Sequence, residues 1–99
     1  MAKGDFDDAR KHFEQALRIE PSNAEYHSGY AYLLDQLGHK EEAAAECETA
    51  VRLAPKSPQA HYGYGAFLEK HGKPEEAIAN YRQTLQLDPN HVDAHIDLG

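Results

Sequence analysis

The chain has 99 residues, of which 40% are hydrophobic and 27% charged, the proportions of an ordinary soluble globular domain rather than of a disordered segment. Its formal net charge of −7 argues against a nucleic acid or an anionic membrane as partner, because either requires a basic surface. The single cysteine, Cys47, excludes an internal disulfide, and no stretch is apolar enough for a signal peptide or a bilayer span, so we expect a cytoplasmic protein without membrane insertion.

Turn and cap residues divide the chain into six predicted helical segments. Glycine tolerates positive φ and proline cannot continue a helix, so Gly38 and Pro55 are expected to end the second and third segments. Gly72 and Pro89 play the same roles one unit later. The predicted segments are 5–20, 24–37, roughly 41–54, the two equivalent stretches of the next unit, and a helix that begins at 92.

The helix starts carry their own signals. Ser57 followed by Pro58 is an N-cap residue before a proline at the first helical position, and Pro74 starts the next helix in the same way. Acidic pairs are expected to open three helices, where they face the positive end of the helix dipole. Adjacent helical residues point apart, so these pairs are not catalytic dyads. The pairs are Asp7–Asp8, Glu41–Glu42 and Glu75–Glu76.

Three columns of residues repeat with a period of 34: Gly4, Gly38 and Gly72; Ala9, Ala43 and Ala77; Pro21, Pro55 and Pro89. One fixed period at independent positions indicates an array of one repeated unit, in which each unit buries its apolar face against its neighbours. We expect a single domain over 1–99, made of a half unit (1–23), two whole units (24–57 and 58–91) and the start of another (92–99).

The chain resembles the tetratricopeptide repeat, whose 34-residue pattern is W-x2-L-G-x2-Y, then A-x3-F, then P. Histidine stands in place of the tryptophan in every unit, at His27, His61 and His95. The resemblance implies an all-α fold, a right-handed solenoid of antiparallel helix pairs wound into a superhelix. The residues that carry it are His27, Tyr30, Ala31, Leu34, Ala43, Cys47 and Pro55 in one unit, His61, Tyr64, Gly65, Leu68, Ala77, Tyr81 and Pro89 in the next, and Ala9, Phe13 and Pro21 before them.

Each unit has two helices, and on the first of them one stripe of residues packs between helices. A second stripe on this first helix is predicted to face a partner. In proteins that this chain resembles, that stripe lines a concave groove where a peptide lies, whereas the plain alternative is a solvated helix face. Tyr32 and Tyr62 would be the anchors, and the acids would favour a basic or apolar segment of a protein or peptide. The predicted groove residues are Glu25, Ser28, Tyr32, Asp35, Gln36, Gln59, Tyr62, Ala66, Glu69, Lys70, Asp93 and Ile96.

One subgroup of the family grips the C-terminal carboxylate of its partner with cations from successive first helices. Ser28, Tyr32, Gly63, Asp93 and Asp97 stand at the corresponding positions here. Because none of them is a cation and two are acids, we do not expect a carboxylate clamp.

Two further sites compete with plain structural interpretations. His91 and His95, spaced i, i+4 with Asp93 between them, could hold a metal ion, but no third ligand is fixed by spacing. Cys47 could be a nucleophile only beside an activating base, and it stands at the large core position of the repeat. We therefore expect no metal, no cofactor and no enzymatic activity.

The leading hypothesis is a non-catalytic module or scaffold for protein–protein interaction. The alternative is a structural element that forms homo-oligomers through its terminal helices, because an uncapped repeat face can pair with another copy. The apolar residues of those terminal helices are Phe6, Phe13, Ile96 and Leu98.

Overall fold

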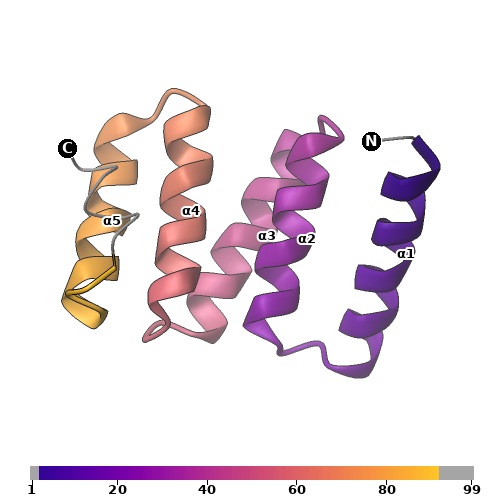
Figure 1. Cartoon of the computed structure of the whole chain (residues 1–99), viewed down its shortest axis with the longest axis horizontal. Coiled ribbons are helices and arrows are strands. Elements are labelled where there is room, and N and C mark those ends of the chain that lie inside the picture. Colours follow the sequence, from indigo (N-terminus) through magenta and orange to yellow (C-terminus); the bar gives the residue numbers. More distant parts are fainter. Residues whose placement is uncertain (1–2, 92–99) are drawn as a thin grey trace.

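The computed structural model describes residues 3–91, and over this range the chain is all-α, as predicted. Successive helices run antiparallel and stand in a row from α1 to α5 (Figure 1), with α3 packed behind the contact between α2 and α4. The helices are α1 (Lys3–Ile19), α2 (Ala24–Gln36), α3 (Lys40–Leu53), α4 (Pro58–Lys70) and α5 (Pro74–Leu87). The expected sixth segment lies outside the described residues.

The predicted turn and cap residues act as expected. Gly38 and Gly72 have φ of 86° and 78°, the left-handed conformation that lets glycine end α2 and α4. The Ser57 hydroxyl accepts a hydrogen bond from the Ala60 amide at 3.3 Å and caps α4. Asn23 caps α2 in the same way through the Tyr26 amide at 3.1 Å, a cap that was not among the predicted ones.

The start of α1 differs from the prediction. The helix begins at Lys3 rather than at residue 5, because one glycine near a helix end costs only about 1 kcal/mol and no proline interrupts the turn. Asp7 and Asp8 therefore lie in its second turn, where the helix dipole is weaker. The other two acidic pairs do occupy the first turns of α3 and α5.

The core is made of alanines interleaved with a few large side chains. Ala43 and Ala50 are completely buried, so their helix can approach its neighbours closely. The large buried side chains are Leu34, Leu68 and Tyr81, with 1%, 3% and 1% of their surface exposed, and Leu68 and Tyr81 pack with Ala77 between α4 and α5. Because α3 packs on both α2 and α4, and these two helices also touch each other, α2 and α4 share one face of the molecule.

The histidines at the tryptophan position of the repeat tie each first helix to the turn before it. The Nε2 atom of His27 is 2.7 Å from the Pro21 carbonyl oxygen, and that of His61 is 2.8 Å from the Pro55 carbonyl oxygen. His27 also contacts Glu46 through Nδ1 at 2.7 Å. The imidazole thus replaces the bulk of the aromatic residue and adds a hydrogen bond at each junction.

Candidate functional site

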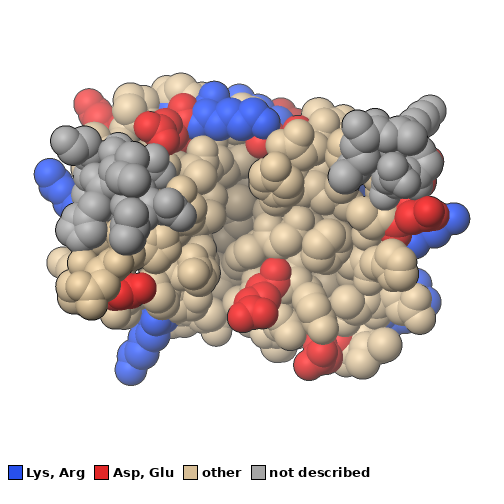
Figure 2. Space-filling view, viewed as in Figure 1, with Lys and Arg blue, Asp and Glu red and all other residues tan. Residues whose placement is uncertain are grey.

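A cavity of about 370 Å³ opens between α2 and α4, near the middle of the face shown in Figure 2. Both first helices contribute to it, and α3 closes its base with one residue. Its lining residues are Ser28, Ala31, Tyr32, Asp35, Gln36, Cys47, Ala60, Tyr62, Gly63, Tyr64, Ala66, Phe67 and Lys70. The stripes predicted on the two first helices therefore do face one shared recess.

The described groove candidates line this cavity or a smaller recess beside it, with one exception. The smaller recess, about 130 Å³, is lined by Glu25 and Gln59 among others, and it adjoins the cavity at Ser28 and Ala60, which line both. We call the two together the groove. The exception is Glu69, whose carboxylate lies outside both recesses and accepts a hydrogen bond from the Tyr81 hydroxyl at 2.8 Å. Asp93 and Ile96 lie outside the described residues.

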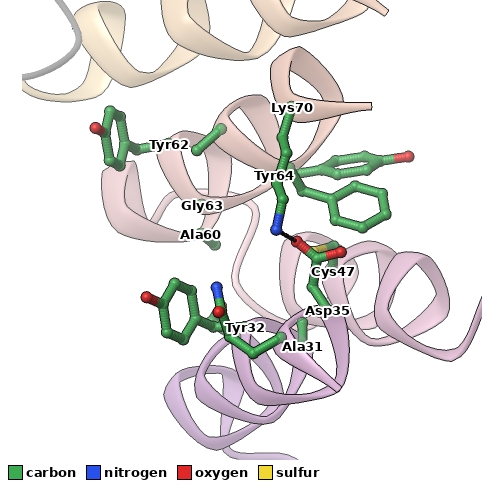
Figure 3. Close-up of a pocket in the computed structure, with 13 residues that line it drawn as sticks. Ala31, Tyr32, Asp35, Cys47, Ala60, Tyr62, Gly63, Tyr64 and Lys70 are labelled. Atoms are coloured by element: carbon green, nitrogen blue, oxygen red, sulfur yellow. Dashed lines mark hydrogen bonds and ion pairs between the residues drawn. The ribbon is translucent and has the colours of Figure 1, made fainter. Parts of the chain in front are cut away.

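Tyr32 and Tyr62 flank one side of the cavity, as Figure 3 shows. Tyr32 has 70% of its surface exposed. Tyr62 is half-buried, because its ring packs against Tyr81 and His91 at centroid distances of 5.6 and 4.8 Å. The groove therefore has one fixed and one more accessible aromatic ring.

Asp35 joins the two first helices on the other side of the cavity (Figure 3). Its carboxylate accepts hydrogen bonds from Lys70 Nζ at 2.8 Å and from His71 Nε2 at 2.7 Å. Burial works against ionisation, but these two hydrogen bonds outweigh it and hold the pKa of Asp35 below its ordinary value. Asp35 was predicted to add to the negative charge of the groove, whereas the ammonium of Lys70 offsets that charge.

Cys47 is an unpaired, buried cysteine at the base of the cavity. Burial, together with the negative charges of Asp35 and Glu46, raises the pKa of its thiol to about 12. The thiol therefore stays protonated at neutral pH, and a protonated thiol is a poor nucleophile.

Six residues of the cavity were not predicted, because the repeat pattern assigns Ala31, Cys47 and Tyr64 to the packing between helices and the other three stand outside the predicted stripe. A cavity forms where packing residues are small, so its position depends on side-chain size within each column of the repeat. The signal was present: cysteine at 47 stands where the neighbouring units have phenylalanine and tyrosine. The missed residues are Ala31, Cys47, Ala60, Gly63, Tyr64 and Phe67.

No group of three histidine, cysteine or acidic side chains within 3–91 is arranged to hold a metal ion. His91 instead packs on Tyr62, and its Nε2 is 3.2 Å from the Gln59 side-chain oxygen. The other two members of the candidate metal group weighed above, Asp93 and His95, lie outside the described residues. None of the described helices combines the length and the apolar character that a bilayer crossing requires.

Two family models, both described as tetratricopeptide repeat, match residues 1–66 and 58–91. Among solved structures, a thermophilic TPR protein of Thermus thermophilus is 24% identical, with a TM-score of 0.87 over 95% of this chain and 48% of that one. The first TPR of Spaghetti (RPAP3), bound to an HSP90 peptide, is 27% identical, with a TM-score of 0.85 over 97% and 76% of the two chains. The Naa15/Naa10 complex bound to HypK-THB contains a chain that is 29% identical, with a TM-score of 0.87 over 94% of this chain and 14% of that one.

The chain spans about half the length of the Thermus protein, so the comparison with that protein concerns the repeat fold. No curated protein matches the sequence.

Proposed function

Because the chain belongs to the tetratricopeptide repeat family, we propose that it is a non-catalytic protein-interaction module whose partner is a peptide segment lying in the groove between α2 and α4. The observation that carries this proposal is the shared recess, in which side chains from two successive first helices face one cavity of about 370 Å³. Two of the structural neighbours have a bound peptide or protein in their descriptions, which supports a partner of the same kind.

The lining of the groove favours an apolar or basic segment. Lys70 offsets Asp35, and among the described residues that line the groove the remaining formal charge is Glu25. The other lining residues are aromatic, small or uncharged and polar, and such surfaces gain affinity mainly by burying apolar partner atoms. An acidic segment is disfavoured, because the ammonium of Lys70 is already paired with Asp35 and the chain carries a net charge of −7.

A displayed peptide library selected on the immobilised chain tests this proposal. Tyr32→Ala and Tyr62→Ala should each weaken the selected binders at least tenfold, since buried tyrosines commonly dominate an interface. Tyr26→Ala is the matched control, because Tyr26 is also on α2 but lies outside both recesses. Binders that are insensitive to both groove variants would contradict a role for the groove.

An alternative proposal is self-assembly through an end of the array. It is supported by Ile19, which has 74% of its surface exposed on α1, the helix at one end of the row in Figure 1. Light scattering over a range of concentrations decides between the two, because a monomer at every concentration contradicts self-assembly and leaves the groove proposal intact.

A further inference from the structure

The contact between α1 and α2 holds an aromatic ring in a particular place. A Cβ atom at Gly29 would lie 2.7 Å from Cε1 of Phe13, so the ring occupies the space that this glycine leaves open. The same ring stacks on Tyr30, with centroids 6.0 Å apart and an interplanar angle of 23°. Phe13, Gly29 and Tyr30 thus form one packed unit.

The contact between α3 and α4 is the same contact one period of 34 residues later, but its ring is missing. Cys47 stands in place of Phe13, while Gly63 and Tyr64 repeat Gly29 and Tyr30. A Cβ atom at Gly63 would meet nothing within 4 Å.

The two tyrosines of these contacts are held alike. The Tyr30 hydroxyl donates to Glu14 at 3.4 Å, and the Tyr64 hydroxyl donates to Glu48, the equivalent acid, at 3.2 Å. The frame around the ring position is therefore preserved, and Cys47, Gly63 and Tyr64 all line the cavity.

We propose that this cavity receives an aromatic side chain of the partner, which takes the position against Gly63 and Tyr64 that Phe13 takes against Gly29 and Tyr30. This inference rests on the proposed function and adds the chemistry of the anchor. The cavity of about 370 Å³ holds one such side chain, and an aromatic ring brings a large apolar area with few rotatable bonds.

Charge gives the second element of the partner. Glu25 lies at the far end of the same groove, and no cation pairs with it among residues 3–91. Ser28, one helical turn after Glu25 on α2, lines both recesses, so the smaller recess adjoins the cavity. The partner segment therefore carries a lysine or arginine within a few residues of its aromatic residue.

The test uses synthetic peptides and the ¹⁵N-labelled chain. The probes are Ac-AFAAKA-NH₂ and the reverse order Ac-AKAAFA-NH₂, each with a phenylalanine-to-alanine and a lysine-to-glutamate counterpart. At least one of the two orders should shift the amide signals of Gly63 and Tyr64 saturably. Removing the phenylalanine should weaken binding at least tenfold, the loss expected for one buried aromatic side chain. Glu25→Gln should remove the preference for lysine over glutamate.

Two substitutions at one position provide the matched comparison. Cys47→Phe restores the ring found in the neighbouring unit and should abolish binding of the aromatic peptide, whereas Cys47→Ala keeps the cavity and should preserve it. Gly63→Leu fills the cavity from α4 and replaces Cys47→Phe if circular dichroism shows that the latter does not fold.

Aromatic peptides that bind Cys47→Phe and Gly63→Leu as well as the natural chain would overturn the inference. So would equal affinity for the phenylalanine and alanine peptides, or no saturable binding of either order. Library binders that lose affinity for Tyr32→Ala and Tyr62→Ala, but bind Cys47→Phe as tightly as the natural chain, would overturn the inference while the proposed function stands.

Discussion

Gly63 and Gly65 lie two residues apart on α4, yet the space beside each is different. At Gly65 a Cβ atom would approach the Tyr81 ring to 2.8 Å and the Ala77 carbonyl oxygen to 3.2 Å. Tyr81 is 1% exposed, so it has no room to move away. At Gly63 the space is open. The first glycine therefore belongs to the groove and the second to the close approach of α4 and α5.

Alanine at these two positions should change stability in opposite directions. Gly63→Ala should raise the free energy of unfolding by about 1 kcal/mol, because alanine loses less backbone entropy in a helix and meets no neighbour. Gly65→Ala should lower it by about 1–3 kcal/mol through overpacking against Tyr81. Urea denaturation followed by circular dichroism measures both, and shifts of the same sign would contradict the assignment.

The residue scale is where prediction from the sequence was least complete. The stripe rule placed Tyr32 and Tyr62 on the groove, because helical spacing alone determines which residues share a face. It assigned Cys47 to a filled core, because a repeat pattern records the usual occupant of a column and not the volume that a smaller residue leaves. It also treated Asp35 and Lys70 separately, although they meet across the two units.

Helix ends, by contrast, follow closely from the sequence. Gly38, Gly72 and Ser57 act through backbone conformation or a local hydrogen bond, which involve only nearby residues. The start of α1 was placed wrongly because no cap residue marks it. Contacts between helices, such as those of Asp35, bring together residues far apart in the chain, and no local sequence pattern predicts them.

The cap of α4 can be tested by one substitution. Ser57→Ala should lower the free energy of unfolding by about 1 kcal/mol, because the Ala60 amide loses its hydrogen-bond acceptor. Ser22→Ala is the control, since Ser22 is exposed in the turn after α1 and caps no helix. Thermal unfolding compares the two, and equal melting temperatures for both variants would exclude a capping contribution.

The link between α2 and α4 through Asp35 should make stability depend on pH. The folded-state pKa of Asp35 is lowered, so its contribution is fully present above the ordinary aspartate pKa of about 3.9 and is lost as pH falls through the lower folded value. Asp35→Asn should therefore cost about 1–3 kcal/mol at pH 7, where hydrogen bonds to the charged group are lost.

The same variant should differ less and less from the natural chain as the pH drops below about 4. Denaturant unfolding at pH 7, 5, 4 and 3 measures the difference. Asp88→Asn is a suitable control, because the Asp88 side chain accepts a hydrogen bond from the Asn90 amide in the turn after α5 and pairs with no cation within residues 3–91. A constant difference between Asp35→Asn and the natural chain at all pH values would contradict the role of the carboxylate.

As a whole, the described part of the molecule is a short array measuring 37 × 26 × 21 Å. Each helix packs mainly on its sequence neighbours, as the period of 34 residues predicted, and α2 and α4 also touch. Stability in such an array is close to a sum of local terms, so its parts need not open together.

Hydrogen exchange should show that the helices differ in local stability. The amides of α1 should exchange faster than those of α2 and α3. Among the described helices, α1 has a substantial contact only with α2, whereas α2 and α3 each pack on more than one helix (Figure 1). Mass spectrometry of exchange time courses gives the comparison peptide by peptide. Equal protection over all five helices would mean that the array unfolds as one unit.

The contact between histidine and the proline carbonyl has a consequence for how such chains change length. Its two partners are six residues apart, so a gene duplication of one 34-residue stretch that starts ahead of the proline copies the junction complete. The cavity behaves differently, because Cys47 and Gly63 come from two successive units. Duplicating 58–91 alone places Tyr81, and not a cysteine, before the new glycine, so the pairing of Cys47 with Gly63 is not copied. Copying the cavity requires a duplicated stretch that includes both Cys47 and Gly63, whereas copying the junction requires only the proline and the histidine six residues after it.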